Sequence, residues 1–207
     1  MTTHSRASRT TRERAKAERA DALVEAAARL FAQHGFDGVS LEELGSAVGV
    51  SGPAVYRHFD SKRALLGAIL LRASSDLLAG GRHVTAAGHD AQRSLRELVD
   101  FHVDFAVRSA DVIRVQDRDL TRLSDEDRRT VRRLQREYME LWVDVLRAVH
   151  PDRGDTDLRV RAHAGFGLIN STPYVVRTRR EVAVDAETDA LLRQILSEMA
   201  YAALATP

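Results

Sequence analysis

The chain has 207 residues, enough for one large hydrophobic core or for one core and a smaller appended unit. It contains no cysteine, which excludes disulfide bonds and thiolate chemistry and favours a reducing, cytoplasmic compartment. The formal net charge of +1 indicates no class of partner, and no apolar run approaches the roughly 18 residues that span a bilayer. The start of the chain also lacks the apolar segment of a signal peptide, so we expect no membrane association.

Basic residues are concentrated at the start of the chain. Residues 1–20 carry six of them, at positions 6, 9, 12, 14, 16 and 19, against Glu13 and Glu18. We expect residues 1–17 to form a flexible basic arm. Such an arm is most often a solvated tail, and it contacts nucleic acid only where a DNA-reading unit follows it.

Helical periodicity dominates the rest of the chain and predicts an all-α fold. Gly35 is expected to end the first helix, and Ser40 with Glu43 forms a capping box at the start of the second. Glycines 80 and 81 are expected to separate two later helices. The expected helices lie at about 18–34, 41–48, 51–59, 62–78, 92–109, 112–120, 124–149, 156–172 and 186–205.

The segment after Ser40 has the spacing of two short helices joined by a tight turn. Counting from Leu41, Gly45 is the fifth residue and Gly49 the ninth. Two helices that cross at about 100° need a small side chain at the fifth position and a left-handed backbone at the ninth. The fourth, eighth, tenth and fifteenth positions are apolar, namely Leu44, Val48, Val50 and Val55. This pattern predicts a helix-turn-helix, whereas an ordinary helical corner would need only the glycine at the turn.

A helix-turn-helix reads DNA by placing its second helix in the major groove. Gly52 and Pro53 would keep the start of that helix slim, Arg57 is the strong base-reading donor, and Ala54 offers only a methyl contact. Three further side chains are expected to bind phosphates: Tyr56, His58 and Lys62. Phe59 and Leu66 are expected to face the core.

The stretch FAQHGFDG, followed by SLEELGSAVGVSGPAVYRHFDSKRALL, resembles the DNA-binding domain of the tetracycline-repressor (TetR) family of bacterial transcription regulators. The resemblance covers about residues 18–75, and it departs at Gly45, where the family usually has Ala. It implies phosphate contacts from Ser40, Tyr56, His58 and Lys62, and groove contacts from Ser51, Gly52, Pro53, Ala54 and Arg57. Because the chain has 29 Arg and only two Lys, a lysine at position 62 indicates a compact phosphate-binding charge.

The resemblance also implies how the rest of the chain is organised. A helix-turn-helix domain at 18–62, with a linking helix to about 78, would be followed by a larger helical domain at 63–207. That domain would enclose a pocket for a small-molecule inducer and would form a homodimer through the last two helices. The dimer would set two recognition helices roughly 34 to 36 Å apart on double-stranded operator DNA.

Candidate ligand contacts are aromatic, apolar or amide residues on the helices of this second domain, and each has an ordinary core role as its alternative. They are Phe101, His102, Phe105, Tyr138, Trp142, Phe166, Asn170 and Tyr174. The segment 114–123, RVQDRDLTRL, is either an ion-paired solvated helix or the place where Arg114, Arg118 or Arg122 meets an anionic ligand, such as the phosphates of an acyl-coenzyme A. A neutral lipophilic compound is a comparable choice.

Signals for other chemistry are weak. The stretch GFGLIN at 165–170 lacks the third glycine of a dinucleotide-binding turn, the eight histidines lack metal-ligand spacing, and no local motif of a hydrolase or nucleotide-binding loop occurs. We therefore expect no catalytic site, no metal and no cofactor. The sequence favours a ligand-responsive repressor released from a palindromic operator by a hydrophobic or acyl-coenzyme A-like inducer. The alternatives are an inducer-independent DNA-binding regulator or activator, and a helical enzyme or ligand carrier with an incidental helix-turn-helix.

Overall fold

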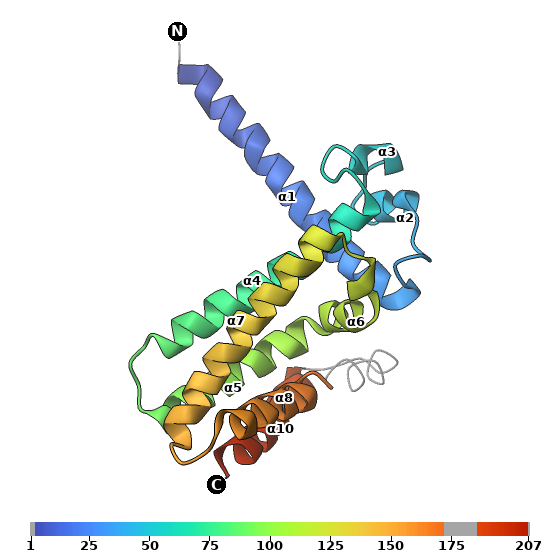
Figure 1. Ribbon diagram of the computed structural model, residues 1–207. Helices are drawn as coiled ribbons and strands as arrows, with labels where there is room; N and C mark the ends of the chain where they lie inside the picture. Colours follow the sequence, from blue (N-terminus) through green and yellow to red (C-terminus); the bar gives the residue numbers. More distant parts are fainter. Residues whose placement is uncertain (1–2, 172–185, 207) are drawn as a thin grey trace. The chain divides into compact units, whose positions relative to one another are not determined.

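The computed structural model describes the backbone of residues 3–171 and 186–206, with the side chains of 13–171 and 187–206, and this part of the chain is helical without a β-strand (Figure 1). The predicted all-α fold is confirmed. In chain order the elements are α1 (Thr3–His34), α2 (Leu41–Ser46), α3 (Gly52–Val55), α4 (Lys62–Thr85), α5 (Ala91–Arg108), α6 (Ala110–Asp119), the 3-10 helix η1 (Leu120–Arg122), α7 (Asp125–Val149), α8 (Asp155–Ile169) and α10 (Ala186–Ala205).

The chain forms two compact units. The first contains Met1–Leu71 and Arg114–Arg128, and the second contains Arg72–Ile113 and Arg129–Pro207. We expected residues 114–128 in the second unit, and this is corrected by their contacts. Arg118 donates a hydrogen bond to the carbonyl oxygen of Phe31 at the end of α1, and Arg122 forms a 2.6 Å ion pair with Asp37.

The first helix begins earlier than predicted. Instead of a flexible arm followed by a helix from about Glu18, α1 runs from Thr3 without interruption. The segment is rich in Ala, Arg and Glu, which are good helix formers, and Arg14 forms a 2.9 Å ion pair with Glu18 one turn later. The basic residues near the start of the chain therefore belong to a helix.

Helix α4 passes through the two glycines that were expected to end it, and this expectation was wrong. A side chain at Gly80 would collide with the ring of Phe101, and a Cβ at Gly81 would lie 2.6 Å from the ring of Tyr138. The glycines therefore admit aromatic rings from α5 and α7.

The apolar character of α4 was also underestimated. The helix is long and apolar enough, by length and composition alone, to cross a membrane, and half of its apolar window is buried within the protein. Leu65, Leu66 and Ile69 are among its buried residues, so protein packing accounts for much of this apolar character.

Local capping follows the sequence closely. The Ser40 hydroxyl accepts a hydrogen bond from the backbone N–H of Glu43, and the Glu43 carboxylate accepts one from the backbone N–H of Ser40. The hydroxyls of Ser61 and Ser124 likewise accept hydrogen bonds from the backbone N–H groups three residues later. These bonds satisfy donors that would otherwise be unpaired at helix starts.

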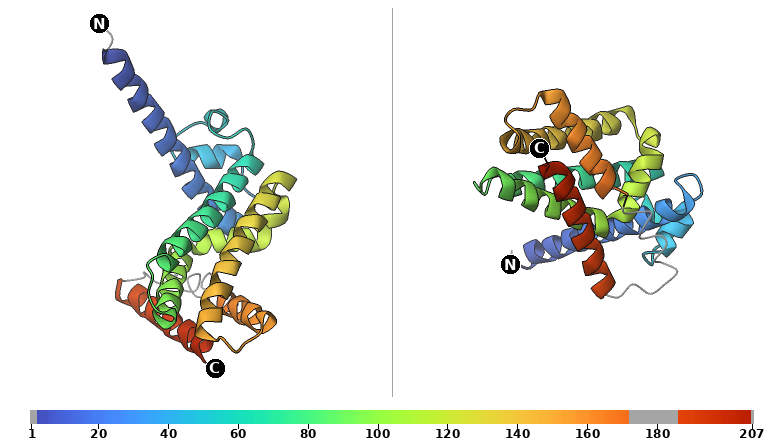
Figure 2. Two further views of the ribbon diagram at one scale, coloured as in Figure 1. Left: turned by 60° about the vertical axis from the view of Figure 1, so that its left-hand side comes forward. Right: turned by 90° about the horizontal axis from the view of Figure 1, so that it is seen from below.

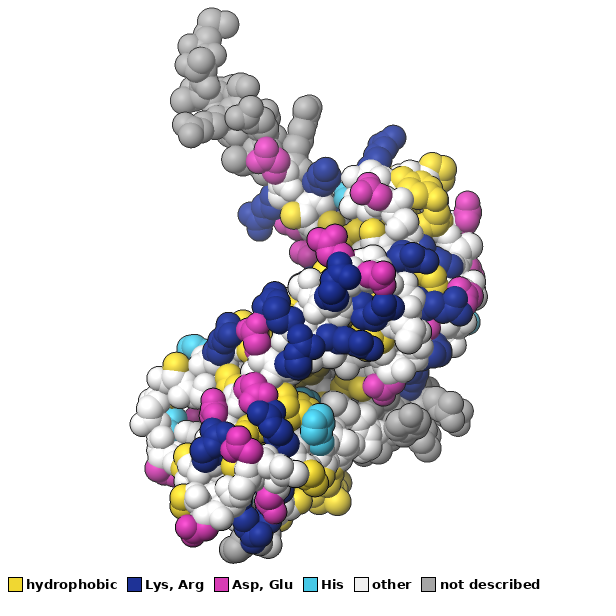
Figure 3. All heavy atoms as spheres, viewed as in Figure 1, with side chains coloured by type: hydrophobic (Ala, Val, Ile, Leu, Met, Phe, Trp, Pro, Cys, Tyr) yellow, Lys and Arg dark blue, Asp and Glu magenta, His cyan; other side chains and the backbone are white. Residues whose placement is uncertain are grey.

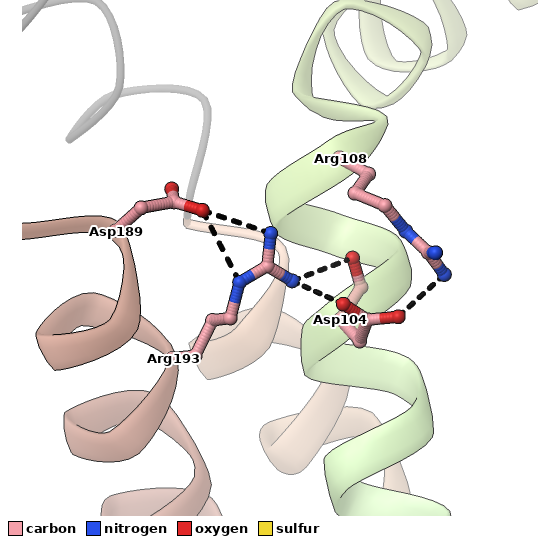
Figure 4. A network of polar contacts seen from close by, with 4 residues as sticks. All are labelled: Asp104, Arg108, Asp189 and Arg193. Atoms are coloured by element: carbon pink, nitrogen blue, oxygen red, sulfur yellow. Dashed lines mark hydrogen bonds and ion pairs between the residues drawn. The ribbon is translucent and has the colours of Figure 1, made fainter. Parts of the chain in front are cut away.

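The second unit has an apolar core made by α5, α7, α8 and α10, with Leu95, Leu98, Leu146 and Leu158 completely buried. Helix α10 packs against α5 and α8 (Figures 1 and 2). Arg193 of α10 fixes part of this packing, because its guanidinium contacts Asp104 of α5 and pairs with Asp189 at 3.0 Å (Figure 4).

Candidate functional site

The predicted helix-turn-helix is present in the first unit. Helix α2 ends at Ser46, Gly49 turns the chain with a φ of 70°, and α3 begins at Gly52. A Cβ at Gly45 would lie 2.6 Å from the carbonyl oxygen of Val50, so α2 and the turn approach each other more closely than an alanine allows. The glycine that departs from the usual family pattern is thus required by the turn itself.

The recognition helix is shorter than expected. Helix α3 ends at Val55, and residues 56–58 continue as turns. Tyr56 and Arg57 nevertheless project outward: the Tyr56 side chain is 53% exposed, and Arg57 is exposed without an ion-pair or hydrogen-bond partner among the described residues. An exposed, uncommitted guanidinium beside an exposed phenol is suited to bind the edges and phosphates of DNA.

The remaining residues of this segment divide into two groups. Ser51 and Pro53 are exposed, and the Ser51 hydroxyl makes no capping bond, so it is free to bind an external acceptor or donor. Gly52 is buried, and a Cβ there would lie 3.2 Å from the backbone nitrogen of Glu42. Its small size therefore serves the packing of α3 on α2, and its contact with the groove stays a prediction. Ala54 is half-buried.

Lys62 has an internal role that the sequence did not reveal. Its ammonium donates a 2.9 Å hydrogen bond to the carbonyl oxygen of Val39 and lies 4.6 Å from the centre of the Phe36 ring. Because an ammonium has three N–H donors, the bond to Val39 leaves others for a phosphate. Lys62 thus fixes the loop before α2, and its role toward DNA stays a prediction.

His58 lies among cations. Burial lowers its pKa, and the charges of Lys16, Arg19 and Arg57 lower it further. Its buried Nδ1 has no hydrogen-bond partner in the described structure. Ser40, the other predicted phosphate contact, is exposed at the start of α2, where its hydroxyl already takes part in the capping box.

Five of the predicted ligand contacts meet in the second unit. His102 Nδ1 lies 3.1 Å from the Tyr138 hydroxyl, and His102 Nε2 lies 3.3 Å from Asn170 Oδ1. The rings of His102, Tyr138, Trp142 and Phe166 pack against one another with centroids 4.9 to 6.3 Å apart. We call these five residues the aromatic cluster.

The aromatic cluster is uncharged at neutral pH. Burial lowers the pKa of His102 to about 4 and raises the pKa of Tyr138 well above its ordinary value. The buried indole N–H of Trp142 has no acceptor in the described part of the chain. A cluster of neutral polar groups and rings suits an apolar, uncharged group and disfavours an ion.

The other predicted ligand contacts lie elsewhere. Phe101 packs on Gly80 of α4, and Phe105 is half-buried on α5. Arg114 and Arg118 belong to the first unit, where Arg118 is bonded to Phe31 and Asp119, so the structure does not group them with the aromatic cluster. Tyr174 lies outside the described residues.

The second unit also has an open cleft of about 640 Å³ that no sequence pattern indicated, formed by the end of α4, the start of α5 and one side of α7. Four charged side chains on its wall already have partners: Arg82 and Glu137 pair with each other, while Glu140 and Asp144 pair with arginines outside the cleft. Basic and acidic side chains are likewise interspersed over the face seen in Figure 3. The cleft therefore offers little uncommitted charge to a ligand.

The first unit contains a helix-turn-helix with exposed polar groups on its recognition segment, and the second is a helical unit with a buried aromatic cluster. This combination is typical of helix-turn-helix regulators. Residues 23–69 match the family described as bacterial regulatory proteins, tetR family, and residues 88–174 match a tetracyclin repressor-like C-terminal domain. The two matches together span more than half of the chain. The protein belongs to the tetR family of bacterial transcription regulators.

Two characterised relatives show the range of this similarity. The transcriptional repressor KstR2 of Rhodococcus jostii (strain RHA1) is 28% identical over 186 residues, which cover 88% of this chain and 89% of the relative. The transcriptional activator FasR of Mycolicibacterium smegmatis is 34% identical over 88 residues, which cover 42% of this chain and 40% of the relative.

Solved structures share the fold. A TetR-family regulator from Bordetella parapertussis has a TM-score of 0.74 at 25% identity, with 87% of this chain and 93% of that chain covered. FadR from Bacillus subtilis, solved in complex with stearoyl-CoA, has a TM-score of 0.64 at 15% identity, with 87% and 97% covered.

Proposed function

We propose that the protein is a cytoplasmic transcriptional repressor that binds a near-palindromic operator as a homodimer and leaves it when a small apolar ligand binds the second unit. The observation that carries the proposal is the exposed pair of Tyr56 and Arg57 beside a short recognition helix whose other side is packed into the first unit. Arg57 would read a base edge, and Tyr56, His58, Lys62 and Ser40 would bind phosphates, with Ser51, Pro53 and Ala54 at the groove.

Exposed apolar side chains on α10 support the homodimer. Leu191, Ile195 and Met199 are 52%, 44% and 53% exposed, and their spacing of four residues places them along one side of the helix. Val160 of α8 is 62% exposed. An apolar stripe of this kind is typical of a surface that a second copy covers.

The neutral aromatic cluster supports a ligand with an apolar group. A fatty acyl chain or a ring system buried beside Trp142 would keep its charged part, such as the phosphates of a coenzyme A ester, in water. The stearoyl-CoA complex of the Bacillus subtilis relative makes acyl esters the first compounds to examine.

Helix α4 is the element that would transmit binding, because it contributes Lys62–Leu71 to the first unit and Arg72–Thr85 to the second. A ligand that prefers a different arrangement of α4 would shift the population of dimers away from the half-site spacing of the operator.

The experiment that tests DNA binding measures the affinity of the purified protein for DNA from its own promoter over a series of salt concentrations. Arg57→Ala is expected to reduce operator affinity by about tenfold or more and to relax base preference, because one bidentate base contact is worth about 1 to 3 kcal/mol. Arg153→Ala, which removes the same charge from the loop between α7 and α8, is the matched control and should have no effect. Equal affinities of the two variants would reject the assignment of Arg57.

The ligand is tested with the single tryptophan of the chain, Trp142, whose fluorescence reports directly on the aromatic cluster. Acyl-coenzyme A esters of increasing chain length, free fatty acids and steroids are titrated, and the active compound should release operator DNA at the same concentrations. Ligand binding without release of DNA would reject the regulatory mechanism.

An activator is the second candidate, because the FasR relative is one. The two functions differ in a transcription assay with the bound promoter: a repressor lowers transcript yield when it is added without ligand, and an activator raises it.

A further inference from the structure

The N-terminal part of α1 extends beyond the part of the helix that packs in the first unit. Figure 1 shows this part of α1 extending away from α2 and α3 within the first unit. Lys16 and Arg19 are exposed on it, and each lies seven residues, about two turns, before a completely buried residue, Leu23 and Ala26 respectively. Lys16 and Arg19 therefore lie on the same side of α1 as the buried residues Leu23 and Ala26. We call these two exposed residues the basic stripe.

Acidic residues of α1 lie both near Lys16 and away from it: Glu13 is about 60° around the helix axis from Lys16, and Glu18 is about 160° around it. Arg14 pairs with Glu18 at 2.9 Å, and Arg14 lies about 160° around the axis from Lys16. Lys16, by contrast, has no ion-pair partner among the described residues. The sequence repeats the same spacing toward the start of the chain, with arginines at positions 9 and 12, seven residues before Lys16 and Arg19.

The basic stripe begins beside the reading residues. Arg19 donates a 3.4 Å hydrogen bond to the carbonyl oxygen of Val48 in the helix-turn-helix turn. Lys16, Arg19 and Arg57 also act together on His58, whose pKa they lower. The electrostatic field of the basic stripe therefore overlaps with that of the recognition segment.

We propose that the basic stripe on α1, formed by Lys16 and Arg19, binds the phosphate backbone of DNA next to the half-site read by Arg57. This rests on the proposed function and adds a second, sequence-independent part to the interface. Positions 9 to 19 span about 15 Å along the helix backbone, a length over which each strand of B-DNA presents about four phosphates. A helix is about 10 Å or more across and does not enter a minor groove about 6 Å wide, so the stripe follows the backbone.

The proposal is tested by the salt dependence of DNA binding. The logarithm of the binding constant falls with the logarithm of salt concentration, and each phosphate contact contributes about 0.9 to the slope. Lys16→Ala/Arg19→Ala is expected to lower the slope by about two for each protomer and to weaken operator and random DNA by the same factor. Arg14→Ala removes one charge from the opposite side of the same helix and should leave the slope unchanged.

Because Arg19 also bonds to the turn, two further variants keep the test independent of folding. The double variant Arg9→Ala/Arg12→Ala removes charge ahead of the packed part of α1, and Lys16→Arg/Arg19→Lys keeps both charges and should preserve the slope. The role of the basic stripe in DNA binding would be overturned if both double alanine variants had the same salt dependence as Arg14→Ala while Arg57→Ala still bound the operator weakly. That result would leave the proposed function standing. Failure of the wild-type protein to bind DNA would instead overturn the function.

Discussion

Arg118 is expected to be a major stabilising residue of the first unit, although it was proposed from the sequence as a ligand contact. Its guanidinium donates a hydrogen bond to the carbonyl oxygen of Phe31 and pairs with Asp119 at 2.9 Å. The Asp119 side chain is only 7% exposed, whereas that of Arg118 is 42% exposed. The Arg118→Ala variant would thus leave a nearly buried carboxylate without its cation.

The magnitude follows from these two contacts. A hydrogen bond from a charged donor contributes about 1.5 to 3 kcal/mol, and breaking a fully buried ion pair costs about 3 to 5 kcal/mol. The exposure of Arg118 and its position next to Asp119 in the chain, where some pairing persists after unfolding, reduce the second value. We expect Arg118→Ala to lower the free energy of unfolding by about 3 kcal/mol.

The assay is urea unfolding followed by far-ultraviolet circular dichroism. Arg122→Ala is the matched control, because its 2.6 Å pair with Asp37 has side chains 54% and 66% exposed and should contribute less than about 1 kcal/mol. Adding Asp119→Asn to Arg118→Ala should recover part of the loss, since a neutral amide is less costly to bury than a carboxylate. Equal losses from Arg118→Ala and Arg122→Ala would refute this reasoning.

Three further predictions concern the turn and the aromatic cluster. Gly45→Ala should destabilise the protein by about 1 to 2 kcal/mol in thermal unfolding, because its methyl group would lie 2.6 Å from the Val50 carbonyl oxygen. This loss should exceed the gain from the better helix propensity of Ala, and a rise in melting temperature would contradict it. Burial lowers the pKa of His102 from 6.5 to about 4, so the unfolded chain takes up a proton at this histidine at a higher pH than the folded protein does. The free energy of unfolding should therefore fall by up to about 3 kcal/mol as the pH drops from 6.5 toward 4. A His102→Gln variant with an unchanged pH dependence would argue against that assignment. Tyr138→Phe removes the hydroxyl 3.1 Å from His102 Nδ1 and should cost about 1 to 3 kcal/mol in urea unfolding, and a neutral result would show that the ring nitrogen finds another partner.

The amino-acid sequence determined the helix-turn-helix and its caps. Gly49 takes the left-handed backbone that the ninth position requires, and Ser40 and Glu43 form the predicted capping box. These features were predictable because the groups that interact lie within a few residues of one another, so their spacing alone fixes the geometry. The predicted bounds of the last helix, 186–205, were likewise confirmed, because its periodicity and length are local properties.

The tertiary structure decided how residues distant in the chain are used. Gly81 lies inside a helix, and the ring of Tyr138, 57 residues later, occupies the space that a side chain at position 81 would need. Arg118 stabilises the end of α1 because Phe31, 87 residues earlier, lies within its reach. His102 is held neutral because α5, α7 and α8 bury it together. None of these environments has a local pattern, since each depends on which helices pack together, and that is fixed by the fold as a whole.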